Sequence, residues 1–379
     1  MKPWNVEICD VTLRDGEQTP GVSFTCEEKM EIATQIDAVG VEVIEAGFPV
    51  VSENEKACVR AVCNMGLDAR VCCLSRALKQ DVDAAIDCGV DLVSIFFATS
   101  DRHIRVKYRC SREEMTEQAL SMIEYARDHG IAVRFAAEDA SRTDTEILKD
   151  LYLRGAECGA EYSGFADTVG FLTPLEMAAA MRDICSAVPN KVAVHCHNDM
   201  GCAGANTITA AACGAFQLHT TVNGIGERAG NAPLEEVLVA LRMKGGVDRY
   251  DLTLIPYLSE IVQDHSGIRM MATKPVVGRN VFSHESGIHI AAILEDPETY
   301  EYILPEQVGR HRQFVLGKHT GRKGLEHILQ KTGIELTPRQ IAWVLNRVKE
   351  ISEGKCAVTQ DVLLRVIEKA REGTDDHPL

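Results

Sequence analysis

The stretch CDVTLRDGEQTPG, which runs from Cys9 to Gly21, decides the fold. Its first half is largely apolar, and its second half places Arg14, Asp15, Glu17 and Gln18 within five positions. An apolar strand that stops in clustered charge is typical of the catalytic rim of a β/α barrel, where the active site lies at the carboxyl ends of the strands. The same pattern should then recur along the chain.

Seven further apolar segments end in polar residues in this way, and amphipathic stretches such as 26–40 and 112–130 lie between them. The latter have apolar residues at helical spacing and a glycine where the helix would stop. Such alternation predicts a parallel sheet, and eight repeats match the roughly 250 residues of an α/β fold of the (β/α)8 TIM-barrel type. An open doubly wound sheet is the alternative, although the Gly-rich dinucleotide fingerprint is missing after the first strand. The eight expected strands begin at Val6, Val41, Ala69, Asp91, Ala132, Tyr162, Lys191 and Phe216.

Composition indicates an enzyme of the cytoplasm that acts on small molecules. The chain has 379 residues, 45% of them hydrophobic, and a formal net charge of -16, which argues against nucleic acid and anionic membranes as partners. Its apolar stretches fall short of the roughly 18 residues of a membrane span, and MKPWNVEICD lacks the apolar core of a signal peptide. We expect the 14 cysteines to be reduced and mostly buried.

The segment HCHND carries the sharpest chemical signal. His195 and His197 are two apart on an expected strand, so both imidazoles face the same side. With Asp15 across the barrel they could bind one divalent cation, with open positions that suit Mg, Mn or Zn. Cys196 would point to the opposite face. Two hydrogen-bonded histidines without a metal are the alternative.

Polar residues at the other strand ends complete the expected rim. Together they predict an anion-binding pocket beside the metal, and the alternative is a set of paired charges that cap strands. After the eighth strand, NGIGERAGNAPLEE places Asn231 just before a helix expected near Pro233, where backbone amides can hold a ligand. The rim residues are Glu45, Glu138, Asp139, Asp167 and Thr168, with Arg14, Arg76 and Arg134 as nearby positive charges.

Four motifs taken in order resemble the DRE-TIM metallolyase family, and within it the Claisen-condensing acyltransferases, namely the isopropylmalate, citramalate and homocitrate synthases. They are DVTLRDGEQTPG, HCHNDMG, NGIGERAGNAPLEE and HESGIH, and the resemblance extends from about Glu7 to about Gly324. EDASRTD, LEDPETYE and VGRHRQFVLGKHTG most resemble homocitrate synthases of the nitrogen-fixation and methanogen coenzyme type.

The resemblance implies a role for each matching residue. Asp15, His195 and His197 would hold the divalent metal, with Asn231 as a weaker ligand. Arg14 would stabilise the enolate and the oxo-acid carbonyl, and Glu138 would be a polar residue of the catalytic pocket. The implied substrate contacts are Gln18, Glu45, His103, Arg134 and Thr168.

The resemblance also implies three parts: a barrel at 1–270, a linker and subdomain at 271–325, and a helical carboxyl-terminal subdomain at 326–379. The middle part would reach over the active site of a neighbouring subunit in a homodimer or larger homo-oligomer, and would bring the catalytic His289 with Tyr300 assisting. Without the resemblance, His284 and His289 would be exposed loop residues. In the last part, TPRQ predicts a helix start with Thr337 as N-cap.

The implied reaction condenses acetyl-CoA, as co-substrate, with a 2-oxo acid. Arg134 matches an arginine that grips the distal carboxylate of 2-oxoglutarate, which favours homocitrate as product, whereas Leu74 and Ala136 depart from that pattern. Isopropylmalate or citramalate synthase, with 2-oxoisovalerate or pyruvate as acceptor, is the alternative. An HMG-CoA lyase-like enzyme, a biotin-linked carboxyltransferase and a non-catalytic 2-oxo acid sensor are further alternatives. The end of the chain near 379 leads us to expect no control by leucine or isoleucine.

Overall fold

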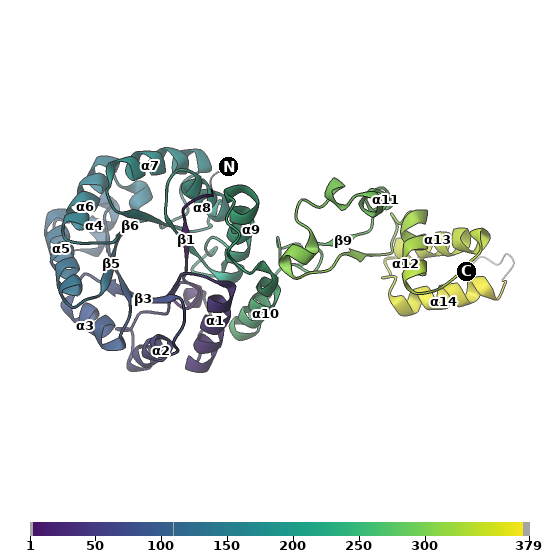
Figure 1. Ribbon diagram of the computed structural model, residues 1–379, viewed down its shortest axis with the longest axis horizontal. Coiled ribbons are helices and arrows are strands. Elements are labelled where there is room, and N and C mark those ends of the chain that lie inside the picture. The colour runs from purple at the N-terminus through teal and green to yellow at the C-terminus, as the bar shows by residue number, and fades with distance from the viewer. Residues whose placement is uncertain (1–2, 109, 374–379) are drawn as a thin grey trace. The chain divides into compact units, whose positions relative to one another are not determined.

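The computed structural model describes residues 3–108 and 110–373. The chain divides into two compact units, Met1–Met270 and Met271–Leu379. Among the described residues of the first unit, eight strands pair in chain order, and β8 pairs in parallel with β1 to close a barrel (Figure 1). The predicted TIM barrel is confirmed.

All eight barrel strands lie within the segments predicted from the sequence. Their bounds are β1 (Glu7–Asp10), β2 (Val43–Glu45), β3 (Arg70–Arg76), β4 (Leu92–Ala98), β5 (Ala132–Glu138), β6 (Tyr162–Asp167), β7 (Lys191–Cys196) and β8 (Gln217–Thr220). The helices of this unit are α1 (Cys26–Val39), α2 (Glu53–Cys63), α3 (Lys79–Cys88), α4 (Asp101–Lys107), α5 (Arg112–Asp128), α6 (Thr145–Glu157), α7 (Pro174–Ala187), α8 (Ala203–Ala212), α9 (Leu234–Gly245) and α10 (Ile255–Ser266).

Local signals fix where the helices begin and end. Thr25 caps α1: its hydroxyl accepts from the Glu28 backbone N–H, and the Glu28 carboxylate accepts from the Thr25 N–H at 2.7 Å. This capping box satisfies two amides that the helix itself cannot pair. Gly40 ends α1 in the left-handed region at φ 93°, where a side chain would be strained. Both ends of α1 are therefore fixed by local interactions.

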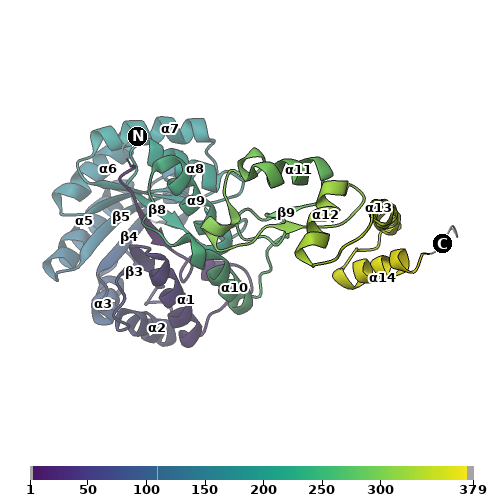
Figure 2. The same ribbon diagram turned by 45° about the vertical axis from the view of Figure 1, so that its right-hand side comes forward.

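The second unit has its own small sheet and its own core. Strands β9 (Ser283–His284) and β10 (Gln313–Phe314) pair in parallel, and α11 (Gly287–Glu295) follows β9. Figure 2 shows helices α12 (Arg322–Lys331), α13 (Pro338–Glu353) and α14 (Gln360–Arg371). Their apolar side chains form a separate buried cluster. Thr337 caps α13 with Gln340 as its partner, as predicted. The two short strands carry too few residues for a period-two pattern and were not predicted.

One expectation about the cysteines is wrong. Cys26 and Cys58 form a disulfide, with their Cα atoms 5.0 Å apart. They are 32 residues apart in the sequence but lie on α1 and α2, which are neighbours around the barrel. The remaining 12 cysteines are free. In the part of the chain that the structure describes, no helix is long and apolar enough to cross a membrane.

Candidate metal centre and substrate cavity

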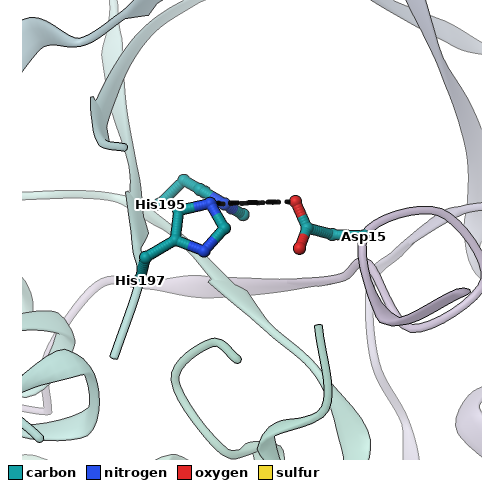
Figure 3. A group of neighbouring side chains, drawn as sticks. All are labelled: Asp15, His195 and His197. Atoms are coloured by element: carbon teal, nitrogen blue, oxygen red, sulfur yellow. Dashed lines mark hydrogen bonds and ion pairs between the residues drawn. The ribbon is translucent and has the colours of Figure 1, made fainter. Parts of the chain in front are cut away.

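Three side chains meet at the carboxyl ends of β1 and β7. His195 lies on β7 and His197 follows it, so both imidazoles point to the same side, toward the carboxylate of Asp15 (Figure 3). Nε2 of His195 is 3.6 Å from Oδ2 of Asp15, and Nε2 of His197 is 4.0 Å from the same oxygen. The two Nε2 atoms are 3.2 Å apart.

These separations fit a divalent cation. Ligand atoms that share an ion at about 2.0–2.2 Å lie roughly 3–3.6 Å from one another, and the three observed distances lie within a few tenths of an ångström of that range. Burial and the nearby His197 lower the pKa of His195 well below its usual value, so the ring is neutral and able to coordinate. Burial alone would raise the pKa of Asp15, but Arg14 and the two imidazoles outweigh it and hold that pKa below its usual range.

Asn231 supports this site from the loop after β8. Its amide nitrogen donates to Oδ1 of Asp15 at 2.7 Å and to the Ile225 carbonyl at 3.1 Å. Its Oδ1 is buried and has no hydrogen-bond partner in the described part of the chain. Asn231 therefore orients the Asp15 carboxylate, and its own oxygen is available as a further ligand.

A chain of buried charges continues from Asp15 into the barrel. Arg14 donates to Oδ2 of Asp15 at 2.6 Å and, through Nε, to Oε1 of Glu45. The other Glu45 oxygen accepts from Arg134. Burial alone would raise the pKa of Glu45, but the guanidinium groups of Arg14 and Arg134 outweigh that effect. The pKa is therefore lowered, and the carboxylate is ionised. Glu45 therefore orients both arginines.

Arg134 is fully buried and yet lines the cavity. A guanidinium has five N–H donors, and this one contacts five side-chain groups of the barrel interior. A substrate carboxylate would therefore have to replace one of these partners. The contacts are Ser94 Oγ at 3.0 Å, Gln217 Oε1 at 2.7 Å, the Glu45 carboxylate, Cys9 Sγ at 3.4 Å and Cys72 Sγ at 3.6 Å.

A cavity of about 270 Å³ opens beside the metal ligands. Most of the predicted site residues line it, while Glu45 and Asn231 are buried behind it. Sequence reasoning missed His219, Glu227 and Arg228, although all three follow β8 or lie on it, beside the NGIGER motif that was noted. The predicted residues along the cavity wall are Arg14, Asp15, Gln18, Leu74, Arg134, Ala136, Glu138, Thr168, His195 and His197.

Two predicted rim residues, Arg76 and Asp167, have other roles. Arg76, expected near the pocket, instead pairs with Asp81 at 2.7 Å because α3 begins close behind β3, and it does not line the cavity. Asp167 accepts from the backbone amides of Phe171 and Leu172 and so shapes the loop after β6. The prediction of a pocket charge is therefore wrong for Arg76.

His103 and Asp139 lie next to the pocket wall. Nδ1 of His103 is 3.6 Å from Oε1 of Glu138, and its Nε2 is 3.7 Å from Oδ2 of Asp139. Asp139 also pairs with Arg142 at 2.8 Å. His103 thus contacts a residue of the cavity wall without lining the cavity itself.

The two predicted catalytic residues of the second unit lie together within that unit. The rings of His289, on α11, and Tyr300 stack with centroids 4.0 Å apart and an angle of 30°. The alternative for His284 was an exposed loop residue. Its Nε2 lies 2.9 Å from Oε1 of Glu301, and Glu301 also pairs with Arg312. His284 is therefore partly buried and paired, whereas His289 and Tyr300 are exposed.

Fold and site together define a TIM-barrel protein with a candidate divalent-metal centre at the carboxyl ends of its strands. The HMGL-like family matches residues 5–262, and the homocitrate synthase post-HMGL domain-like family matches residues 276–356. The chain belongs to the HMGL-like family, and its resemblance to the DRE-TIM metallolyases is confirmed.

Relatives and solved structures agree with this assignment. The chain is 52% identical to homocitrate synthase AksA of Methanosarcina mazei over 98% of its own length and 92% of the relative's. It is 49% identical to a probable 2-isopropylmalate synthase of Methanopyrus kandleri, over 97% of this chain and 75% of that one. The crystal structure of the HMG-CoA lyase of Bacillus subtilis shares the fold, with a TM-score of 0.66 and 20% identity over 74% of this chain and 97% of that one.

We predict that Gly226→Ala disrupts metal binding. An added Cβ would lie 2.1 Å from Nδ2 of Asn231 and 2.9 Å from Oδ1 of Asp15, so both groups would have to move. Mn²⁺ affinity, measured by electron paramagnetic resonance, should fall at least about tenfold. Gly21→Ala is the matched control, because Gly21 also has a positive φ but has open space around it. Equal affinity in both variants would contradict the prediction.

Proposed function

We propose that this protein condenses acetyl-CoA with 2-oxoglutarate and hydrolyses the resulting thioester, giving homocitrate and CoA. The observation that carries the proposal is the convergence of Asp15, His195 and His197 beside Arg14 in a cavity at the barrel mouth. The 52% identity to a homocitrate synthase over nearly the whole chain supports this choice of reaction. A cytoplasmic location remains a prediction.

The residues around the metal would bind and activate the 2-oxo acid. A divalent cation supplies Lewis-acid polarisation of the keto group when it is bound by this ligand set, and Mg, Mn or Zn suits one carboxylate and two imidazoles. Arg14 is charged and lies within 2.6 Å of the ligand Asp15. Its guanidinium would stabilise negative charge as it develops on the reacting oxygens.

The carbon–carbon bond requires a base. We propose His289, with Tyr300 assisting, as the group that removes a methyl proton from acetyl-CoA. The resulting carbanion carbon attacks C2 of the 2-oxo acid, whose keto oxygen takes up a proton to become a tertiary hydroxyl. Water then cleaves the thioester, releasing a carboxylate and the CoA thiol. By the family resemblance, His289 would serve the barrel of another subunit, in at least a homodimer.

A second candidate is 2-isopropylmalate synthase, and one observation favours it. Leu74 and Ala136 give the cavity apolar walls, and the guanidinium of Arg134 already has partners for its donors. A branched 2-oxo acid needs no ion pair at its distal end. Comparing acceptors decides between the two reactions, with CoA release from acetyl-CoA as the measured rate.

Removal of divalent metal should abolish activity, and Mg²⁺ or Mn²⁺ should restore it. Asp15→Ala should lower both Mn²⁺ affinity and turnover by at least about a hundredfold, because it removes a ligand and leaves two imidazoles. The control is His265→Ala, which removes an imidazole paired with Glu31 on α1. Full activity of the Asp15 variant would exclude the metal site as proposed.

The acceptor preference should depend on Arg134. With wild-type protein, 2-oxoglutarate should exceed pyruvate and 2-oxoisovalerate in kcat/KM. Arg134→Met should reduce kcat/KM for 2-oxoglutarate about 10- to 100-fold more than for 2-oxoisovalerate, because only the dicarboxylate can use a charge-assisted bond of about 1.5–3 kcal/mol. A wild-type preference for 2-oxoisovalerate would transfer the assignment to 2-isopropylmalate synthase.

Subunits that share active sites should complement one another. His289→Ala and Asp15→Ala proteins should each be nearly inactive. An equal mixture that is refolded or incubated together should regain up to about a quarter of wild-type activity, since about half of the dimers are mixed and one of the two sites in each mixed dimer has both groups intact. The same mixture of two Asp15→Ala preparations is the control. A fully active monomer in analytical ultracentrifugation would contradict sharing.

A further inference from the structure

A lysine is buried behind the rim, where the loops after β1 and β2 approach α1. The side chain of Lys29, on α1, is only 1% exposed. Burying an ammonium group is costly unless every donor finds a partner. Its surroundings therefore indicate what the charge does.

Two of its partners are backbone carbonyls beside the site. Nζ of Lys29 is 3.2 Å from the carbonyl oxygen of Leu13 and 3.4 Å from that of Ala46. Leu13 directly precedes Arg14 in the sequence, and Ala46 directly follows Glu45. One ammonium group thus contacts both strand ends that present the charges around the metal.

The other partners are two carboxylates, one in the loop after β1 and one in the first turn of α2. Nζ is 2.8 Å from Oε2 of Glu17 and 2.8 Å from both oxygens of Glu55. Glu17 also accepts from the Phe24 amide at 2.9 Å, and Glu55 accepts from the Phe48 amide at 3.1 Å. Each carboxylate therefore closes its own loop, and Lys29 joins the two.

Gly47 leaves the space that this arrangement needs. A Cβ at Gly47 would lie 2.0 Å from Oε1 of Glu55, so a side chain at this position would push the carboxylate away from the ammonium. The loop after β2 is shaped around the Lys29–Glu55 contact. The contact is built into the fold rather than being a chance pairing of surface charges.

We infer that Lys29 is a positioning residue for the metal centre. Through the Leu13 and Ala46 carbonyls, it fixes the strand ends that lead to Asp15 and Glu45, while Glu17 and Glu55 balance its charge. This inference rests on the metal site of the proposed function and is independent of which 2-oxo acid is used. A purely neutralising role, in which Lys29 balances two partly buried carboxylates, makes a different prediction.

Two variants distinguish positioning from charge balance. Lys29→Met removes the carbonyl contacts and leaves Glu17 and Glu55 without their cation. Lys29→Met/Glu55→Gln also removes the contacts but relieves the unbalanced charge, so it keeps the test open where the single variant does not fold. Glu55→Gln alone retains the ammonium and its carbonyl contacts.

Mn²⁺ affinity of each folded variant, measured by electron paramagnetic resonance, is the readout, with thermal unfolding as the check on folding. Both Lys29 variants should bind Mn²⁺ about 10- to 100-fold more weakly than wild type, whereas Glu55→Gln should stay within about threefold. The control is Lys56→Met on α2, which breaks an ion pair with Asp87 away from the site.

The outcomes separate the inference from the function it rests on. Wild-type affinity in the folded double variant would overturn the positioning role. Weak binding by Lys29→Met with recovery in the double variant would also overturn it in favour of charge balance. A wild-type protein that binds no Mn²⁺ would instead contradict the metal centre itself.

Discussion

The shared carboxylate of Glu45 is the interaction on which the site depends. It lies fully buried between Arg14, which contacts Asp15, and Arg134, which lies within the barrel interior. Without the Glu45 carboxylate between them, the guanidinium groups of Arg14 and Arg134 would repel each other in this interior of low polarity. Removing one member of such a buried network is costly because the remaining charges lose their counterion. The strand ends are therefore fixed in one arrangement before any ligand binds.

Strand periodicity explains why so much of the fold could be predicted. Each barrel strand is a short apolar run followed by polar residues, and this pattern is local, so every strand was found within its predicted segment. The spacing of His195 and His197 is equally local, and alternation along β7 brings both rings to one side. Cys196, one position between them, is buried, and burial raises its pKa to about 12, so it remains a protonated thiol.

What could not be predicted depends on neighbours distant in the sequence. Arg76 looks like a rim cation, but the acceptor it finds is Asp81 on the following helix. The Cys26–Cys58 bridge arises because α1 and α2 are adjacent around the barrel. Both strand ends that Lys29 joins were identified, yet no sequence pattern indicates that one ammonium group contacts both.

A second hydrogen-bond network, which includes the cavity-lining residues Arg134 and His219, limits which ligands the cavity can accept. Glu7 accepts from the Gln217 amide nitrogen at 2.8 Å, which leaves the amide oxygen of Gln217 facing Arg134 and, at 3.2 Å, Nε2 of His219. Because that oxygen can only accept, Nε2 of His219 carries the proton, and its buried Nδ1, which has no hydrogen-bond partner among the described residues, keeps a lone pair. His219 and Arg134 both line the cavity, so the distal group of a ligand that reaches this end meets a neutral imidazole beside a guanidinium whose donors are already engaged.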